Sequence, residues 1–330
     1  MRVMVTGGTG FLGGHTVRAL VDAGHEARLL VRSEEKLGQL IELFGLPPDI
    51  EWTSGDILDA ASVARALDEA EGCVHTAAFT TLDPALMDHC LEVNGPGTKI
   101  VLDAAVAAGC DPIVHMSSIS CIFPPLGDVF DADVDPVRSS EAPYSRSKAE
   151  SDRYARELQA AGHPVVIVYP GGVTGPDDLG FNVMSAIMAG MLASDTLMTG
   201  ATGGGGAVDV RDLATAIARL MQPGGGPRRF LAAGNMLGWD DINALMNEVT
   251  GLQRTNVRMT REEMLDAIKE EEAVDMMLGF KPGNDAPILQ ATGVEWRPMR
   301  ETYRDMIAWL LAQGYLEPHW APAIAAAERN

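Results

Sequence analysis

The sequence predicts an α/β fold, a doubly wound parallel sheet followed by a smaller, mostly helical C-terminal lobe. Short apolar runs rich in β-branched residues recur along the first 170 residues, and segments with apolar residues at helical spacing separate them. A glycine-rich turn directly follows the first of these runs. Strands that alternate with helices form right-handed βαβ units, which build a mainly parallel sheet with helices on both faces.

The elements are expected in a regular order along the chain. Predicted strands cover residues 3–6, 27–31, 74–77, 113–117 and 165–169, and predicted helices cover 15–23, 61–70, 97–108 and 144–161. We then expect a helix over 181–192, and a strand from 208 that runs into a helix. From residue 239 the pattern predicts only polar-rich helices, over 240–250, 261–277 and 301–313. Residues 1–175 and 207–234 are assigned to a nucleotide-binding domain, and 176–206 and 235–330 to the smaller substrate lobe.

Charge and cysteine content exclude several classes of function. The chain of 330 residues has a net charge of -21, which argues against nucleic acid and anionic lipid as partners. Its four cysteines form no CxxC pair, so we expect reduced thiols and no metal site. Neither a leader segment nor an apolar run of 18 residues is visible, which predicts a cytoplasmic protein without a membrane partner.

The glycine-rich turn has the spacing of a dinucleotide-binding loop. Residues 6–13 read TGGTGFLG, which places Gly7, Gly10 and Gly13 at equal intervals between a strand and a helix. One glycine makes the tight turn, one lets the backbone approach a pyrophosphate, and one lets the helix pack closely on the strand. The free N–H groups and the dipole of the helix N-terminus favour an anion there. This segment therefore predicts a Rossmann-type unit at the start of the chain.

A tyrosine and a lysine are spaced for acid–base chemistry. Tyr144 and Lys148 are four positions apart on a predicted helix and therefore lie on one face. A phenol has an ordinary pKa of about 10, and an ammonium group within a few ångströms lowers that pKa toward neutrality. A serine hydroxyl beside the phenol would place the substrate oxygen. Ser117, Ser118 and Ser120 are all candidates, and adjacent strand residues point to opposite faces.

The chain resembles the extended short-chain dehydrogenase/reductase family over residues 1 to about 234. The matching segments are TGGTGFLG at 6–13, GDI at 55–57, HTAA at 75–78, VNGPGT at 93–98, SS at 117–118 and YSRSK at 144–148. A softer match, GVEWRP, lies at 293–298.

This resemblance implies roles for particular residues. The expected catalytic residues are Ser118, Tyr144 and Lys148, in which the tyrosine exchanges a proton with the substrate oxygen and the lysine also holds the nicotinamide ribose. Asp56 is expected at the adenine edge, although a helix-capping role for it stays open. Cofactor contacts are expected at Gly7, Thr9, Gly10, Phe11, Leu12, Gly13, Arg32, Lys36, Asp56, Ile57, Thr76, Ala77, Ala78, Asn94, Tyr144, Lys148, Pro170, Gly171, Gly172 and Val173.

The end of the second strand bears on the choice of cofactor. Enzymes that use NAD place an acidic residue there, which binds the ribose 2′-hydroxyl group. Here the strand leads into Arg32, with Lys36 nearby, and the arginine fork fits the 2′-phosphate of NADP(H). Glu34 and Glu35 follow closely, so NADP(H) is favoured as the cofactor and NAD(H) stays possible.

Within the family, the chain looks most similar to the dihydroflavonol reductase and 3β-hydroxysteroid dehydrogenase branch. The similarity lies in VRS at 31–33 and GVEWRPMRETYRDMIAWL at 293–310. It implies an NADP(H)-dependent ketone or aldehyde reductase, or alcohol dehydrogenase, with Tyr144 as general acid/base. The substrate would be a largely apolar small molecule. Members of the family also commonly form homodimers, here through the helices expected over 94–108 and 144–161.

Two other functions stay open. A sugar-nucleotide epimerase with retained NAD would bind a diphosphate through a basic patch. The candidates for such a patch are Arg228, Arg229, Arg254 and Arg258. A sensor that binds NADP(H) without turnover is the alternative from a different class, and the intact catalytic set argues against it.

Overall fold

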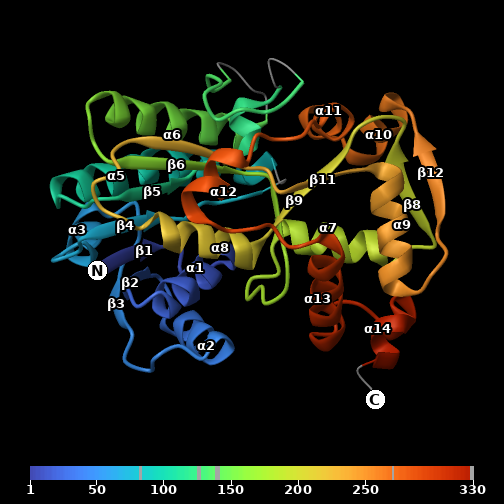
Figure 1. The fold of residues 1–330 in the computed structure, drawn as a ribbon, viewed down its shortest axis with the longest axis horizontal. Helices are drawn as coiled ribbons and strands as arrows, with labels where there is room; N and C mark the ends of the chain where they lie inside the picture. The colour runs from blue at the N-terminus through green and yellow to red at the C-terminus, as the bar shows by residue number, and fades with distance from the viewer. Residues whose placement is uncertain (82–83, 125–127, 138–141, 270, 328–330) are drawn as a thin grey trace.

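A seven-stranded parallel sheet lies at the centre of the computed structural model, which describes residues 1–81, 84–124, 128–137, 142–269 and 271–327 (Figure 1). In spatial order the strands are β3 (Glu51–Ser54), β2 (Glu26–Val31), β1 (Arg2–Thr6), β4 (Gly72–His75), β5 (Ile113–Met116), β6 (Val165–Pro170) and β10 (Arg228–Ala232). All neighbouring strands pair in parallel. The strand order reverses between β1 and β4, and ligands of open α/β sheets bind outside the carboxyl ends at such a point.

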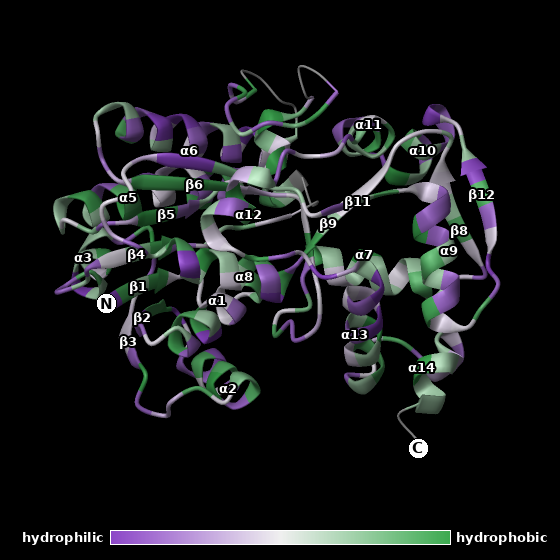
Figure 2. Ribbon diagram, viewed as in Figure 1, coloured by the Kyte–Doolittle hydropathy of each residue, from purple (hydrophilic) through white to green (hydrophobic). Residues whose placement is uncertain are grey.

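Burial explains which strands the sequence pattern predicts. Every residue of β4, β5 and β6 is buried, and all three are apolar runs of the kind that a doubly covered parallel sheet requires. Figure 2 shows β5 and β6 largely in the green of hydrophobic residues. β3 lies at the sheet edge with none of its residues buried. It therefore has no apolar run, and the sequence pattern does not predict it.

Helices cover both faces of the sheet. One face packs against α1 (Phe11–Asp22), α2 (Glu34–Phe44), α8 (Val210–Leu220) and α12 (Ala286–Thr292). The other packs against α3 (Ala60–Ala66), α5 (Thr98–Ala107) and α6 (Pro143–Ala160). Val3 and Val5 face the first layer and Met4 the second, as alternation along a strand requires. The predicted doubly wound α/β fold is therefore confirmed.

Short helical segments lie between these elements. They are 3₁₀ turns at Pro84–Leu86, Ile119–Ile122 and Pro318–Trp320, helix α4 (Met87–Glu92) and a π-helical turn at Val93–Gly97. None of the described helices combines the length and the apolarity needed to cross a bilayer.

The smaller lobe has a core of its own. Its helices are α7 (Val183–Leu192), α9 (Trp239–Thr250), α13 (Met299–Ala312) and α14 (Pro322–Ala327), which bury Trp239, Met246 and Leu310 among others. Two small sheets accompany them, β11 (Asn235–Gly238), β9 (Gly204–Asp209) and β7 (Gly172–Thr174) in one, and β12 (Thr255–Met259) with β8 (Thr196–Gly200) in the other. In Figure 1 this lobe lies on the right, on the side toward which the central strands run.

The structure of the tail departs from the sequence prediction. The expectation of a tail without strands from residue 239 is wrong, because β12 lies within it. Thr255–Met259 has no buried residue, so it carries no alternating apolar pattern, and backbone pairing with β8 holds it in place. The single helix predicted over 261–277 is two helices, α10 (Arg261–Ile268) and α11 (Glu271–Gly279), because Lys269 adopts a left-handed conformation at the end of the first. Moreover, α12 packs on the central sheet although its residues fall in the range assigned to the lobe.

Candidate active site

The glycine-rich turn joins β1 to α1 at the carboxyl edge of the sheet. Gly7 has a φ of +72°, and a Cβ there would lie 2.6 Å from the backbone nitrogen of Ala77. A Cβ on Gly13 would lie 2.0 Å from the Gly7 carbonyl oxygen, so only glycine lets α1 pack on the turn. Gly10 would meet only that carbonyl, at 3.2 Å, and its outer side is open. The three glycines thus divide the tasks of turning, packing and leaving space for a ligand.

The N-terminus of α1 is arranged to receive an anion. Gly10 is the N-cap, no side chain caps the first N–H groups, and the first turn holds no acidic residue. Unpaired N–H groups and the helix dipole favour a negative charge at this place. Thr9, Phe11 and Leu12 lie partly exposed in the same turn. These residues fit the pyrophosphate of a dinucleotide.

Two basic residues and a carboxylate lie where β2 and β3 end. The Arg32 side chain is 72% exposed, and its Nη1 lies 3.7 Å from Asp56 Oδ2. Lys36 is exposed in the first turn of α2. The other oxygen of Asp56 accepts a hydrogen bond from the Leu58 N–H at 2.9 Å, while Asp59 is the N-cap of α3. A pair as long and exposed as that of Arg32 is weak, which leaves its guanidinium available to an incoming anion.

Residues after the other strands complete this edge. Thr76, Ala77 and Ala78 directly follow β4, and the first two lie against Gly7. Ile57 is buried against the π-helical turn, where a Cβ on Gly97 would lie 2.9 Å from its Cδ1 atom. The predicted contacts Pro170, Gly171, Gly172 and Val173 lie at the end of β6 and the start of β7. A Cβ on Gly171 would meet Ala233, just after β10, whereas Gly172 and Val173 pair with β9.

Asn94 is buried and ties two elements of the site together. Its side chain accepts a hydrogen bond from the Phe79 N–H at 2.7 Å and donates to the Phe79 carbonyl at 2.9 Å. It also donates to the Ser147 hydroxyl at 3.0 Å. Asn94 therefore fixes the segment after β4 to α6, and its contact with a cofactor stays a prediction.

Tyr144, Lys148 and Ser118 come together where β5 ends. Tyr144 lies in the first turn of α6, and Lys148 lies one turn further. The phenol of Tyr144 hydrogen-bonds Ser118 and Thr80. Lys148 Nζ donates to the Met116 carbonyl at 2.9 Å and lies 6.0 Å from the centre of the Tyr144 ring. Thr80 is absent from the sequence prediction because it belongs to no recognisable pattern, and only the fold brings it to the phenol.

The three candidate serines have different partners. Ser118 contacts the Tyr144 phenol, whereas the Ser117 hydroxyl lies 3.3 Å from the Cys121 sulfur. Ser120 donates a hydrogen bond to the Ser118 hydroxyl at 3.0 Å. Ser118 is therefore the serine placed beside the phenol, with Ser120 behind it.

Burial determines the protonation of the tyrosine and the lysine. It raises the pKa of Tyr144 to about 12, against the lowering effect of the Ser118 hydrogen bond. It lowers the pKa of Lys148 to about 8. The expectation that the lysine brings the phenol pKa toward neutrality is wrong for this structure, because the ammonium is directed at the Met116 carbonyl. The phenol is neutral at pH 7, which is the form that donates a proton.

The arginines considered for a diphosphate patch do not gather at this edge. Arg254 is 6% exposed and donates to carbonyls within the lobe. Arg258 pairs with an aspartate on the lobe surface. Arg228 and Arg229 begin β10 and thus lie at the opposite end of that strand.

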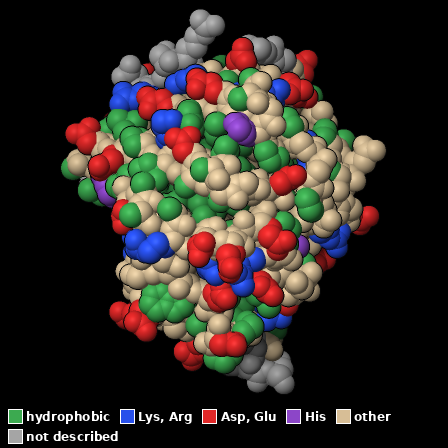
Figure 3. Space-filling model, turned by 90° about the vertical axis from the view of Figure 1, so that its left-hand side faces the viewer, with side chains coloured by type: hydrophobic (Ala, Val, Ile, Leu, Met, Phe, Trp, Pro, Cys, Tyr) green, Lys and Arg blue, Asp and Glu red, His purple; other side chains and the backbone are tan. Residues whose placement is uncertain are grey.

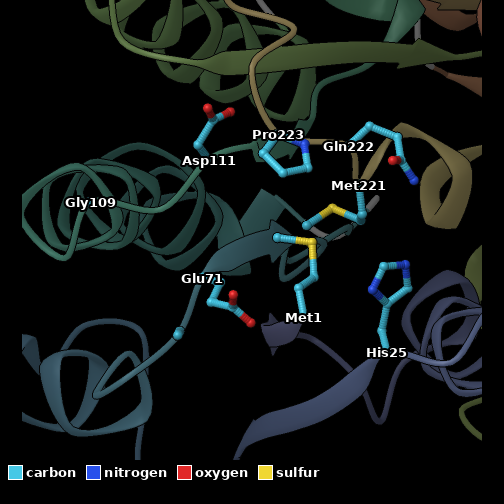
Figure 4. A pocket seen from close by; sticks show the side chains of 9 residues that line it. Met1, His25, Glu71, Gly109, Asp111, Met221, Gln222 and Pro223 are labelled. Atoms are coloured by element: carbon cyan, nitrogen blue, oxygen red, sulfur yellow. The ribbon is translucent and has the colours of Figure 1, made fainter.

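A hollow of about 540 Å³ lies at the amino edge of the sheet. Its lining includes His25, Glu71 and Asp111, which immediately precede or lie within two residues of the starts of β2, β4 and β5. Figure 3 shows this side of the molecule, where apolar side chains gather between charged ones. Figure 4 shows Met1 and Met221 facing each other in the hollow. None of the predicted site residues lines it, so the hollow is separate from the candidate active site.

The chain is similar to a protein-family model, to curated proteins and to solved structures. A family model described as "NAD dependent epimerase/dehydratase family" matches residues 3–233. The chain is 25% identical to sterol demethylase protein B of Methylococcus capsulatus, over 96% of this chain and 100% of that protein. It is 26% identical to a putative dihydroflavonol 4-reductase of Synechocystis, over 95% of each. A nucleoside-diphosphate-sugar epimerase structure from Pseudomonas aeruginosa matches with a TM-score of 0.78 and 22% identity, over 96% of this chain and 99% of that one.

Proposed function

Because this chain belongs to the NAD-dependent epimerase/dehydratase family, whose members are enzymes, we propose that it is an NADP(H)-dependent oxidoreductase of the dihydroflavonol reductase-like type. It would reduce a ketone or aldehyde, or oxidise the corresponding alcohol, on a small and largely apolar molecule. The observation that carries this proposal is the contact of the Tyr144 phenol with Ser118, with Lys148 one turn away on α6.

The residues of the chain supply the proton and the orientation. A bound nicotinamide supplies the hydride in one direction and accepts it in the other. A carbonyl oxygen between Ser118 and Tyr144 would accept a hydrogen bond from each hydroxyl. Tyr144 gives its proton to that oxygen as the carbon gains the hydride, so one hydride and one proton yield the alcohol. The neutral phenol suits this direction, whereas alcohol oxidation requires the phenolate form of Tyr144.

NADP(H) is the proposed cofactor because of the charge at the end of β2. Arg32 and Lys36 are both exposed there, beside the turn that fits a pyrophosphate. A guanidinium fork suits a terminal phosphate better than a hydroxyl group. Lys148 and Tyr144 would hold the nicotinamide ribose at the other end of the dinucleotide.

Apolar side chains around the segment that follows Ser118, and beside Gly172, support an apolar substrate. Phe123 follows the 3₁₀ turn that Ser118 caps, and its ring lies 6.2 Å from that of Phe130. Phe280, at 5.8 Å from Phe130, extends this group from the lobe. Met184 on α7 is 45% exposed, and its methyl group lies 4.0 Å from the place of a Cβ on Gly172. Aromatic rings and flexible thioethers are surfaces that accommodate apolar molecules.

The proposal is tested with a panel of aldehydes and ketones, by the loss of NADPH absorbance at 340 nm. Tyr144→Phe should lower kcat by about 10²–10⁴-fold, because it removes the proton donor, while NADPH binding measured by fluorescence persists. Tyr154→Phe, on the same helix but bonded to Asp103, is the matched control and should retain turnover. Full turnover by Tyr144→Phe would overturn the mechanism.

A sugar-nucleotide epimerase is the second candidate, favoured by the name of the matching family model. Such an enzyme would retain tightly bound NAD through purification and convert a UDP-sugar without added cofactor. The positions of the four arginines give this candidate no diphosphate patch at the site. NADPH binding without turnover of any compound in either assay would instead indicate the sensor.

A further inference from the structure

The connection between α11 and α12 joins the lobe to the sheet domain. It comprises residues 280–284, and in Figure 1 it runs from α11 to α12, which packs on the central sheet. Its backbone pairs with Phe130, which is 1% exposed in the core of the sheet domain. The Phe130 N–H donates to the Pro282 carbonyl, and the Asn284 N–H donates to the Phe130 carbonyl, each at 2.9 Å. Two backbone hydrogen bonds therefore fix this connection to the sheet domain.

Two further contacts hold the same connection in place. Asn284 Nδ2 donates a hydrogen bond to Asp131 Oδ2 at 3.2 Å. A Cβ on Gly283 would lie 2.3 Å from the Cβ of Ala233, just after β10, so only glycine lets the two segments pass this closely. The first residue of the connection, Phe280, is therefore attached to a segment with a defined path.

The Phe280 ring lies between the sheet domain and the lobe. Its centre is 5.8 Å from that of the Phe130 ring. On the lobe side, a Cβ on Gly206 would lie 2.6 Å from Cε1 of Phe280, so the ring rests directly on the backbone of β9. A glycine within a strand is typical of a place where another group approaches the backbone closely. Phe280 thus packs against both parts of the molecule.

The segment that follows Ser118 lies on the sheet-domain side of this ring. Phe123 ends the 3₁₀ turn that Ser118 caps, and its ring lies 6.2 Å from that of Phe130. A ring carbon of Phe123 also lies 3.8 Å from the place of a Cβ on Gly279, the residue before Phe280. The serine that contacts the Tyr144 phenol therefore begins the segment that packs beside Phe280.

The start of β7 lies on the lobe side. A Cβ on Gly172, one of the residues expected to contact the cofactor, would lie 2.9 Å from the Gly206 carbonyl oxygen. The same Cβ would lie 4.0 Å from the methyl group of Met184. Gly206 and Gly172 are thus adjacent, with Phe280 beside the first and Met184 beside the second.

The apolar surfaces around Phe280 are not fully covered by the protein. Met184 is 45% exposed, and the other residues are partly exposed, namely Phe123, Gly172, Gly206 and Phe280. An apolar group of a bound molecule that covers such atoms gains hydrophobic free energy. A carbonyl compound held by Ser118 and Tyr144 would meet these surfaces with the group that it carries beside its carbonyl.

We propose that Phe280 is a specificity-determining residue, whose ring limits the size of the apolar group beside the substrate carbonyl. The contacts of the α11–α12 connection hold the ring in this place. The carbonyl itself rests on the proposed function, but a limit on size applies to binding and requires no turnover.

The limit can be measured by NMR with two ketones that differ by one ring. Ethyl methyl ketone and benzylacetone share the methyl ketone end, and only benzylacetone carries a phenyl group. Each is titrated into protein with ¹³C-methyl-labelled methionine and saturating NADP⁺, which has no hydride to give. Met184→Leu identifies the Met184 signal among those of the 17 methionines. The saturable shift of this signal gives each dissociation constant.

Phe280→Ala should change the ratio of the two dissociation constants by about tenfold or more in favour of benzylacetone, because the phenyl group of the ligand takes the place of the ring that is removed. If Phe280→Ala does not fold, Phe280→Leu should change the ratio in the same direction by a smaller factor. Phe44→Ala is the matched control, since it removes a partly buried ring at the end of α2, 4.8 Å from the ring of His15. It should leave the ratio unchanged.

The outcomes distinguish this inference from the proposed function. An unchanged ratio in the folded Phe280 variants, or no saturable shift of the Met184 signal with either ketone, would overturn the role of Phe280. Turnover of the carbonyl panel with the same size preference in wild type and Phe280→Ala would overturn this inference alone. A changed ratio without turnover of any carbonyl compound supports the role of Phe280, and only the proposed function fails.

Discussion

Single side chains decide the chemistry of this molecule through burial and exposure. Burial shifts the pKa values of both Tyr144 and Lys148. It raises the pKa of the phenol and lowers that of the ammonium group. The Arg32 side chain, by contrast, is 72% exposed, so its guanidinium is accessible to a ligand from solvent. The same sequence thus places proton-transfer groups in a dry environment and a recognition group in water.

The exposed arginine leads to a prediction about cofactor choice. Arg32→Ala should raise the KM for NADPH by about 10–100-fold and change that for NADH less than about twofold, because a hydrogen bond to a charged phosphate contributes about 1.5–3 kcal/mol. Steady-state kinetics with each cofactor measure this ratio. Arg65→Ala, an exposed arginine at the end of α3, is the control and should change neither value. Equal effects of Arg32→Ala on both cofactors would rule out recognition of the 2′-phosphate.

Whole elements depend on the glycines that join them. The turn from β1 to α1 works because Gly7 and Gly13 have no side chains, while other glycines of the chain face open space. Both kinds look alike in the sequence. Only the atoms around each one show which glycine is required and which is tolerated.

This contrast predicts opposite changes in stability when two different glycines are replaced by alanine. Gly13→Ala should abolish cofactor binding and lower the melting temperature, because its Cβ would lie 2.0 Å from the Gly7 carbonyl oxygen. Gly38→Ala, in the middle of α2 with no atom within 4 Å of its Cβ, should stabilise the protein by about 0.5–1 kcal/mol, since alanine favours the helix. Cofactor titration and urea unfolding of both variants check this. Tight NADPH binding by Gly13→Ala would contradict the packing of the turn.

The sheet domain and the lobe are joined by a network of ion pairs. Arg211 on α8 pairs with Asp209, and also with Asp305 on α13, each at 2.8 Å. Arg297 lies 2.7 Å from Asp212 and 3.5 Å from Asp209. The side chain of Asp209 is only 1% exposed and that of Arg211 is 27% exposed, so the carboxylate of this pair is buried and its arginine partly so. The network holds the lobe against the domain that carries the catalytic residues.

This network makes the stability of the folded protein depend on pH in the acidic range. Burial acts to raise the pKa of Asp209, but hydrogen bonds from Arg211 outweigh it and the net pKa is lowered. Its contribution to stability is therefore complete above the ordinary aspartate pKa of about 3.9 and is lost as the pH falls through the lower value of the folded state.

Urea unfolding between pH 7 and pH 2 tests this dependence. Asp209→Asn should be less stable than the wild type at pH 7, and the difference should shrink in acid as the wild-type carboxylate becomes protonated. The exposed Asp88 provides the control, because Asp88→Asn should leave the acid dependence unchanged. A constant difference between wild type and Asp209→Asn at every pH would show that the charge of Asp209 is not the cause.

The features that the sequence determined by itself are local in the chain. The glycine turn, the buried strands β4 to β6 and the four-residue interval between Tyr144 and Lys148 depend on neighbouring residues, so spacing and apolar pattern predict them. The family resemblance that these motifs suggested is confirmed by the matching family model.

Other features were decided only by the tertiary structure. Thr80 reaches the phenol of Tyr144 from a segment whose pattern carries no such signal, and β12 is held by pairing with β8 rather than by an apolar face. The raised pKa of Tyr144 results from burial among segments that are distant in the sequence, so the local spacing of residues does not predict it. The physical reason is that hydrogen-bond partners, desolvation and strand pairing arise between residues far apart in the chain, and these contacts exist only once the sheet and the lobe have assembled.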